Sequence, residues 1–372
     1  MLVSYHNKSL SAPLQVDFGV TNRCNLSCQY CYALANERIN KQEELSFEEI
    51  ALLFQEFSEI GVLKVLISGG EPFIRDDINK ILLLTKQFSF ATYVSTNGTR
   101  ITGETAKIIK KANIDLITVS LEGPNDEIHN KIRRSPFSFK NALRGIEFLK
   151  NEKISFAIGT TLNSINISHM FEMIDFVSGL GAKLFAIQVL CPTGRIADNL
   201  EILPNNEIFK DFFLKLTDIK KRTGFPIEVK LNVVNESPVF WEYYYPLFEG
   251  NKLNDLRDVW KIDLSMKCGN QISCVAGRTT CSIDANGDVY PCEMLLGKPS
   301  YIAGNIRRLK FRKIWKEAIV FEKFRKLTKD RLGSPCNSCS FKWCGGGCRA
   351  AAIFSTGSVS GADRHCRYAN GK

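Results

Sequence analysis

The chain has 372 residues, of which 44% are hydrophobic and 24% charged, a composition typical of a globular protein that excludes an intrinsically disordered chain. Its length favours two domains, or one barrel with an extension, and no apolar stretch is long enough to span a bilayer, so we expect a cytoplasmic protein. The net charge is +10, and residues 307–331 hold eleven Lys or Arg against three acids. Such a run is more often a solvated helix face than a binding surface, so we expect neither a nucleic-acid nor a membrane partner.

Strand and helix patterns alternate along the first 231 residues. Short β-branched runs predict strands at 14–20, 64–68, 90–95, 116–121, 154–162 and 184–190. Ser46 and Glu49 form a capping-box pattern, and apolar residues at helical spacing follow it. Further helices are predicted at about 77–88, 104–111, 138–150, 167–180 and 206–222. Six strand–helix units in succession indicate a parallel α/β fold.

Thirteen cysteines are many for a cytoplasmic chain, in which clustered thiols more often bind metals than form disulfides. Cys24, Cys28 and Cys31 lie within eight residues, directly after the first predicted strand. Iron–sulfur clusters usually have four cysteine ligands, so three thiolates leave one iron open to another ligand. A zinc knuckle would need a fourth ligand, and no further Cys or His lies nearby.

The C-x3-C-x2-C loop, with Tyr30 before its last cysteine, is followed after the second strand by residues 69–72, Gly-Gly-Glu-Pro. Together these motifs resemble the radical S-adenosylmethionine (SAM) enzymes. The resemblance implies a partial six-strand (β/α) TIM-like barrel. It also implies a [4Fe-4S] cluster on the three cysteines, whose open iron binds SAM for cleavage to a 5′-deoxyadenosyl radical.

The same resemblance implies which residues contact SAM. Paired glycines allow close backbone approach, and Glu71 can accept hydrogen bonds from the methionine ammonium. An Arg can bind the methionine carboxylate in bidentate fashion, but the sequence leaves Arg133 and Arg134 as alternatives. The full set of implied SAM contacts is Tyr30, Gly69, Gly70, Glu71, Pro72, Ser95, Asn97, Ser120, Glu122, Arg133, Arg134, Thr160 and Asn163.

A second cysteine-rich region begins at Cys274, which is followed by Gly287 and Cys292 at the spacing C-x12-G-x4-C. With the later cysteines it resembles the SPASM extension of peptide and protein maturases, although four residues rather than five separate Cys339 from Cys344. The resemblance implies two auxiliary [4Fe-4S] clusters, the first on Cys274, Cys281, Cys292 and Cys348, the second on Cys336, Cys339, Cys344 and Cys366. Cys268 is an alternative to Cys281, Cys191 is expected to be a plain buried thiol, and two zinc sites are the non-cluster alternative.

These motifs divide the chain into a barrel at 1–231, a bridge at 232–267 and a SPASM domain at 268–372. Residues 280–283 and 289–291 are predicted to form a β-hairpin. In sulfatase-maturing relatives an Asp follows the cysteine that corresponds to Cys292 and acts as a base. Glu293 is therefore a candidate proton acceptor, and a solvated Glu is the alternative.

The expected function is hydrogen abstraction from a residue of a ribosomally made peptide, giving an oxidative product such as a thioether crosslink. The alternatives are a sulfatase-maturing enzyme that forms formylglycine, a tetrapyrrole side-chain modifier of the haem-biosynthesis type, and an iron–sulfur electron carrier. Expected partners are a peptide or protein substrate and an electron donor such as flavodoxin or ferredoxin. Because only about twenty residues precede the cysteine loop, we also expect either a separate leader-peptide recognition protein or direct capture of the precursor by the bridge and residues 307–316.

Overall fold

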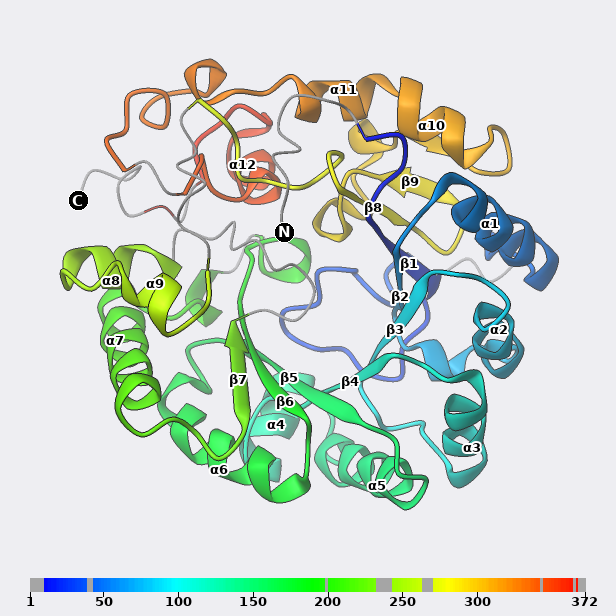
Figure 1. Cartoon of the computed structure of the whole chain (residues 1–372), viewed down its shortest axis with the longest axis horizontal. Coiled ribbons are helices and arrows are strands. Elements are labelled where there is room, and N and C mark those ends of the chain that lie inside the picture. The colour runs from blue at the N-terminus through cyan, green and yellow to red at the C-terminus, as the bar shows by residue number, and fades with distance from the viewer. Residues whose placement is uncertain are drawn as a thin grey trace. The chain divides into compact units, whose positions relative to one another are not determined.

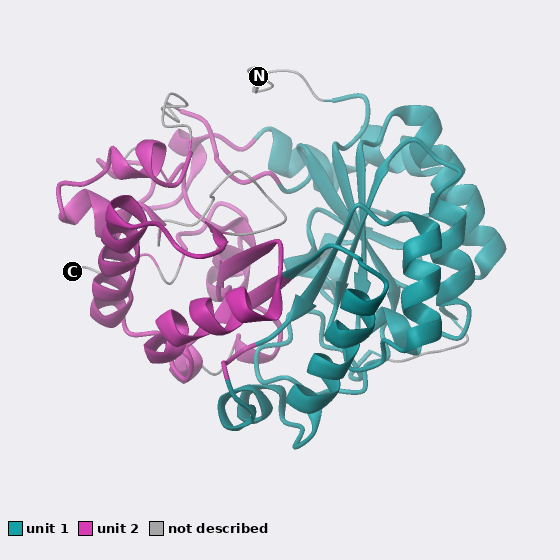
Figure 2. Ribbon diagram, turned by 60° about the horizontal axis from the view of Figure 1, so that its bottom comes forward, with its two compact units in different colours: residues 1–121, 125–157, 276–326 teal, residues 122–124, 158–275, 327–372 magenta. Residues whose placement is uncertain are grey.

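The computed structural model describes residues 10–38, 43–197, 200–231, 243–262, 270–341, 344–363 and 366. The chain divides into two compact units, coloured separately in Figure 2: residues 1–121, 125–157 and 276–326 form the first, and residues 122–124, 158–275 and 327–372 the second. Two parts of the predicted bridge at 232–267, residues 232–242 and 263–267, and Cys268 beyond it lie outside the described residues.

In the first unit, four strands lie in chain order as parallel neighbours: β1 (Gln15–Thr21), β2 (Lys64–Gly69), β3 (Ala91–Thr96) and β4 (Leu116–Ser120). On the other side of β1 lies β8 (Thr280–Ile283), also parallel, followed by the antiparallel strands β9 (Asp288–Tyr290) and β10 (Gly304–Asn305). The predicted strands and hairpin are therefore confirmed to within two residues. The pairing of β8 with β1 was not predicted.

The helices of the first unit are α1 (Phe47–Ile60), α2 (Ile78–Thr85), α3 (Gly103–Ala112), α4 (Asp126–Arg133), α5 (Ser138–Asn151), α10 (Phe311–Glu317) and α11 (Ile319–Arg325). As Figure 1 shows, α1, α2 and α3 follow one another along the outside of the strands, each packed on the next. The sequence did not predict α4, because its eight residues are mostly polar and contain only two isoleucines.

Side chains along β1 point alternately to the two faces of the sheet. Val16, Phe18 and Val20 are fully buried, and the Phe18 ring lies 5.8 Å from the ring of Phe54 in α1. These three side chains therefore face the helices. Asp17 lies between them in the strand and faces the opposite side of the sheet, away from the helical layer.

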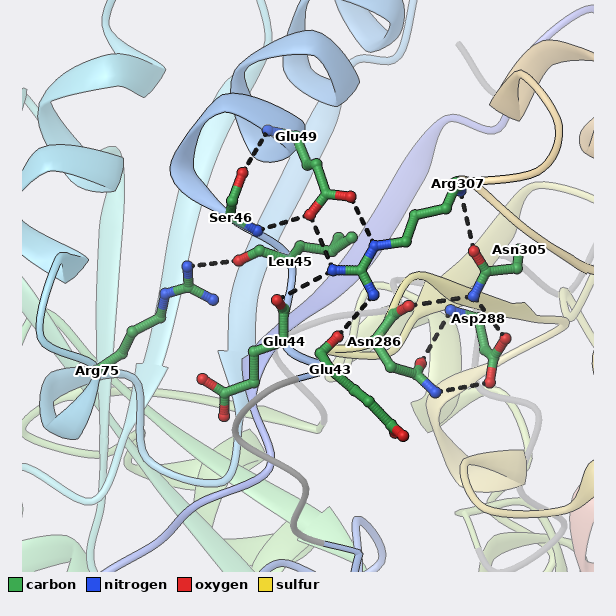
Figure 3. A network of polar contacts seen from close by, with 10 residues as sticks. All are labelled: Glu43, Glu44, Leu45, Ser46, Glu49, Arg75, Asn286, Asp288, Asn305 and Arg307. Atoms are coloured by element: carbon green, nitrogen blue, oxygen red, sulfur yellow. Dashed lines mark hydrogen bonds and ion pairs between the residues drawn. The ribbon is translucent and has the colours of Figure 1, made fainter.

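The capping box at the start of α1 is present and connects to the basic segment (Figure 3). Ser46 Oγ accepts from the Glu49 backbone N–H, while a Glu49 carboxylate oxygen accepts from the Ser46 N–H. The same carboxylate accepts from Arg307 at 2.6 and 2.9 Å, and Arg307 also donates to the backbone oxygens of Glu43 and Glu44. Arg307 thus connects the segment after β10 to the start of α1. Its positive charge is paired with the Glu49 carboxylate within the first unit.

The second unit holds most of β5 (Phe156–Leu162), with β6 (Leu184–Val189) and β7 (Glu228–Leu231). β6 and β7 are parallel, with Leu184 opposite Glu228, and β7 was not predicted. Its helices are α6 (Met170–Leu180), α7 (Asn206–Arg222), α8 (Tyr245–Glu249), α9 (Asp255–Asp258) and α12 (Arg349–Thr356). The start of the helix predicted at 167–180 is a 3-10 turn, Ile167–His169, that leads into α6.

Aromatic side chains form much of the core of the second unit. Tyr243 and Tyr245 are almost completely buried, and their rings lie 5.9 Å from Phe213 and 6.3 Å from Phe209 of α7. These tyrosines therefore serve to pack the core of the unit. Within the described ranges, no helix combines the length and apolarity needed to cross a membrane.

Candidate iron–sulfur and cosubstrate site

The loop that carries Cys24, Cys28 and Cys31 follows β1 and is held by Asn36. The Asn36 side-chain oxygen accepts from the Cys24 N–H at 2.8 Å, and its amide nitrogen donates to the Cys24 oxygen at 2.8 Å and to the Leu26 oxygen at 3.3 Å. Asn36 has a left-handed backbone, φ 69°, which Asn tolerates better than most residues. Asn36 was not predicted, because an isolated Asn after a cysteine motif carries no pattern of its own.

Arg133 reaches this loop from α4. Its guanidinium donates to Cys28 Sγ at 3.3 Å and lies 5.7 Å from the centre of the Tyr30 ring. Arg133 is 7% exposed, whereas Arg134 is an exposed residue that ends α4 with a left-handed backbone. The structure therefore brings Arg133, and not Arg134, to the cysteine loop.

The thiols of the loop differ in environment. Cys28 is buried, while Cys24 and Cys31 are partly exposed. Burial raises the pKa of the Cys24 thiol to about 12, and the nearby Glu71 carboxylate adds to this effect. A bound metal ion would lower this pKa, since thiolate is the form that binds metal.

The two glycines after β2 are required by their contact with the chain that enters the cysteine loop. Gly70 donates to the Thr21 oxygen at 2.7 Å, and the next residue, Glu71, donates from its backbone to the Arg23 oxygen at 2.8 Å. A Cβ atom on Gly70 would lie 2.0 Å from the Arg23 oxygen, and Gly69 has φ 122°. Close backbone packing thus explains this glycine pair without reference to a ligand.

Glu71 joins the ends of β2 and β3. Its carboxylate is completely buried and accepts from Thr96 Oγ1 at 2.6 Å, from the Phe73 N–H at 3.2 Å and from the Asn97 N–H at 2.7 Å. Burial raises the pKa of Glu71, although these three bonds oppose the shift. A carboxylate has roughly four acceptor positions, so one remains for a further donor such as an ammonium group.

The other predicted SAM residues of the first unit lie at strand ends. The Asn97 amide nitrogen donates to Asn25 Oδ1 at 3.1 Å and lies 3.9 Å from Cys24 Sγ, so the loop after β3 contacts the cysteine loop. Pro72 is buried and begins a short 3-10 helix. Ser95 and Ser120 are half-buried near the ends of β3 and β4.

Three predicted SAM residues belong to the second unit. Glu122 is 1% exposed, and its carboxylate accepts from the Thr161 N–H at 3.0 Å. Asn163 donates to the Thr161 oxygen at 2.9 Å and accepts from the Ile165 N–H at 3.0 Å, so its side chain shapes the turn after β5. Thr160 is fully buried within β5. Contacts of these residues with SAM stay predictions.

Glu293 lies beside an acid that the sequence analysis missed. Asp17 of β1 is 2% exposed, and Gln15 donates to its carboxylate at 2.6 Å. Burial raises the pKa of Asp17, and the neighbouring Glu293 carboxyl, which shares a hydrogen bond with it, raises it further. Burial and both acids also raise the pKa of the Tyr32 hydroxyl. An acid inside an apolar strand was the available sequence signal for Asp17.

The four cysteines predicted to hold the second auxiliary cluster come together in the second unit. Cys336, Cys339, Cys344 and Cys366 all line one pocket, with Lys329, Phe341 and Asp363 among its other walls. Burial raises the pKa of Cys344 to about 11 and also raises that of Cys336. The shorter spacing before Cys344 therefore does not remove it from the group.

The predicted ligands of the first auxiliary cluster are distributed between the units. In the second unit, Cys348 precedes α12, and its sulfur accepts from the Ala351 N–H at 3.5 Å. Ser273, the residue before Cys274, donates from its backbone to the Gly345 oxygen at 3.2 Å, so Cys274 is held beside the segment that leads to Cys348.

One buried arginine organises the backbone around Cys348. Arg349 is completely buried and donates to the oxygens of Gly361 at 2.7 Å and Val359 at 3.1 Å, and also to Gly346. Arg349 was not predicted. A basic residue directly after a cysteine gave no indication that it would be buried.

In the first unit, Cys292 is partly exposed and directly precedes Glu293. Cys281 lies in β8 opposite Val16, so its side chain points to the helical side of the sheet and not to the side of Asp17. It is fully buried, and burial raises its pKa, with Arg325 of α11 opposing the shift. This orientation favours the alternative in which Cys281 is a core thiol, and its ligand role stays a prediction.

The arrangement of thiols bears on the zinc alternative. A tetrahedral zinc site with Zn–S distances of about 2.3 Å holds its sulfurs about 3.8 Å apart. In the part of the chain that the structure describes, no three Cys, His, Asp or Glu side chains are grouped in a way that could hold a single ion.

Comparison with known proteins adds to this geometry. Residues 18–177 match the model of the Radical SAM superfamily, and residues 274–340 match the SPASM iron-sulfur cluster-binding domain. The chain is 29% identical over 349 residues to AdoMet-dependent heme synthase of Oleidesulfovibrio alaskensis, covering 94% of this chain and 86% of that protein. It is also 29% identical to the mycofactocin maturase MftC of Mycolicibacterium smegmatis, covering 98% of this chain and 85% of that protein.

Among solved structures, Streptococcus suis SuiB bound to its precursor peptide SuiA has the same fold. Its TM-score is 0.73 at 19% identity, and the match covers 96% of this chain and 76% of that chain. The predicted partial TIM-like barrel with a cysteine-rich extension is thereby confirmed. Radical SAM domains bind a [4Fe-4S] cluster and SAM, and SPASM domains bind auxiliary iron–sulfur clusters, so the expected cofactors are confirmed as well. The three-cysteine loop lies inside the first matched region, and Cys274, Cys281, Cys292, Cys336 and Cys339 lie inside the second, so the chain is an enzyme that carries a Radical SAM domain and a SPASM domain.

Proposed function

We propose that this enzyme abstracts a hydrogen atom from a residue of a peptide and so oxidises it, for example to a thioether crosslink. The observation that carries the proposal is the contact between Asp17 and Glu293 in the unit that also holds the cysteine loop. Oxidation of a C–H bond removes a proton as well as electrons, and a carboxylate at the reacting centre accepts that proton. In this proposal Glu293 is the acceptor, and Asp17 holds it in place.

Bound SAM and its cluster supply the hydrogen-abstracting radical, and the auxiliary clusters supply an electron acceptor. The residues of this chain supply the binding. In this proposal Arg133, which contacts Cys28, binds the methionine carboxylate, and Glu71 accepts from the ammonium group at its remaining acceptor position. The glycine pair keeps β2 against the cysteine loop, which fixes both groups relative to Cys24.

Two of the similar proteins support a peptide substrate: one is a mycofactocin maturase, and SuiB was solved bound to the precursor peptide SuiA. The similarity to heme synthases supports a second candidate, modification of a tetrapyrrole side chain. The neighbouring carboxyls of Asp17 and Glu293 favour the peptide. A neutral peptide side chain meets no repulsion there, whereas a carboxylate of a tetrapyrrole adds a third acid to the group.

The discriminating experiment offers both substrate classes to one preparation. Anaerobically reconstituted enzyme is incubated with SAM, dithionite and either the short peptides encoded next to its gene or Fe-coproporphyrin III. We expect 5′-deoxyadenosine with either substrate present, and a new product mass, about 2 Da lower for a crosslink, with a peptide alone. Conversion of the tetrapyrrole and of no peptide would refute the peptide assignment.

The role of Glu293 is tested separately. In this proposal Glu293→Gln keeps SAM cleavage and loses most of the modified product, because the amide cannot accept the proton. Glu317→Gln is the matched control, since Glu317 of α10 is a largely exposed acid in the same unit. Equal product yields from the two variants would remove Glu293 from the mechanism.

The partners follow from the same proposal. A flavodoxin or ferredoxin of the cytoplasm would supply electrons. Arg308, Lys310, Arg312, Lys313 and Lys316 are exposed along α10 and the turn before it, and would bind an acidic leader peptide. Arg307 is not part of this surface, because it is bonded to Glu49.

A further inference from the structure

Cys191 lies directly against a predicted cluster ligand of the second unit. It follows β6, is 6% exposed, and its Sγ atom is 3.6 Å from the Sγ atom of Cys348, 157 residues later in the chain. No spacing motif includes Cys191, which was expected to be a plain buried thiol. The structure thus gives Cys348 a second thiol as its neighbour.

Both thiols are held by their backbones. The chain before Cys191 is fixed by Tyr243, whose hydroxyl accepts from the Val189 N–H at 3.2 Å, and the Cys191 oxygen accepts from the Thr193 N–H at 2.8 Å. On the other side, the Cys348 N–H donates to Asp363 at 3.2 Å, and Cys348 caps α12. Their proximity is therefore a property of the fold and not of one flexible side chain.

The distance between the two sulfurs has a specific chemical meaning. A disulfide would need about 2.05 Å, so the two thiols are not bonded to each other. Two thiolates on the same tetrahedral metal with metal–sulfur bonds of about 2.3 Å lie about 3.8 Å apart. The observed 3.6 Å is close to that value, so a metal bound by Cys348 Sγ is within reach of Cys191 Sγ with little movement.

We propose that Cys191 is a substitute ligand for the auxiliary-cluster iron that Cys348 binds. When Cys348 is displaced, the Cys191 thiol gives its proton to the departing Cys348 thiolate, 3.6 Å away, and the Cys191 thiolate takes the vacant position on that iron. In a chain without Cys348, the proton goes to water during cluster assembly. The total of thiolate ligands stays the same, so the cluster is retained without any change in its oxidation state. This inference is independent of the substrate of the enzyme.

Iron content of the full-length enzyme, reconstituted anaerobically, tests the proposal. Wild type with three [4Fe-4S] clusters contains about 12 iron atoms per chain. We expect Cys348→Ala and Cys191→Ala to keep about 12, and the double variant to keep about 8, because only the double variant removes both thiols. Electron paramagnetic resonance of the reduced auxiliary clusters should change in Cys348→Ala, since the new ligand comes from the segment after β6 and not from the start of α12.

Cys336→Ala is the matched control. It removes a predicted ligand of the other auxiliary cluster, and we expect about 8 iron atoms whether or not Cys191 is present. SAM cleavage without substrate, which reports on the N-terminal cluster, shows that each variant is folded. If Cys348→Ala loses as much iron as the double variant, or if Cys191→Ala alone loses a cluster, Cys191 is not a substitute ligand and the proposal is wrong.

Discussion

Replacing Asn36 by Ala should release the cysteine loop without touching a thiol. Three hydrogen bonds from this side chain hold the backbone of Cys24 and Leu26, two of them at 2.8 Å. A net value of about 1 kcal/mol for each shorter bond, and less for the third because it is 3.3 Å long, gives about 2 kcal/mol. That energy corresponds to roughly thirty-fold weaker retention of the N-terminal cluster, since 1.4 kcal/mol is tenfold.

The measurement is the rate at which an anaerobic iron chelator removes the cluster whose electron paramagnetic resonance signal responds to SAM. Asn36→Asp should lose iron at least as fast as Asn36→Ala. Its carboxylate keeps the acceptor for the Cys24 N–H but cannot donate to the backbone oxygens of Cys24 and Leu26. Asn113→Ala is the matched control, since Asn113 is also exposed and left-handed, with φ 57°, and ends α3. Iron loss from Asn36→Ala no faster than from Asn113→Ala would show that the side-chain bonds do not hold the loop.

Three further predictions follow from the site. Gly70→Ala should abolish SAM binding and lower the melting temperature, because its Cβ would lie 2.0 Å from the Arg23 oxygen; isothermal titration with SAM and thermal melting measure both effects. Arg133→Ala should weaken SAM binding at least tenfold, while Arg134→Ala should leave it within twofold, since only Arg133 reaches the cysteine loop. Burial lowers the pKa of His129 to about 3. Below pH 6.5 the unfolded chain therefore binds a proton at His129 that the folded chain does not. The free energy of unfolding falls by about 1.4 kcal/mol for each pH unit below 6.5, until pH approaches 3. His129→Gln should flatten this slope, which melting curves at pH 7.5 and 5.5 would reveal; identical slopes would contradict the assignment.

The sequence predicted the strands and long helices well because their signals are local. Ser46 and Glu49 marked the start of α1, and alternating apolar runs marked β1 to β6. β7 was missed because only four residues form it, and two of them, Glu228 and Lys230, are exposed and polar. The short helices near the cysteines likewise lack an apolar face long enough to recognise.

The site was predictable where chemistry dictates residue spacing, and not where tertiary contacts assign roles. The cysteines and Glu71 were found because cluster and ammonium binding need those groups in a motif. Asn36 and Arg349 act through backbone carbonyls that only the folded chain brings to them. The choice of Arg133 over Arg134 depended on where α4 ends, which was not visible without the helix itself.

The parallel pairing of β8 with β1 has a consequence for how the enzyme matures. Ser282 donates to the Asp17 oxygen across 265 residues of sequence, so the strand that leads into the cysteine loop lacks one neighbour until residues near 280 have left the ribosome. Contacts between such distant segments form late, because the intervening chain must first lose its freedom. Cluster loading into the N-terminal loop is therefore expected late in synthesis, once about three quarters of the chain has been translated and β8 can pair with β1.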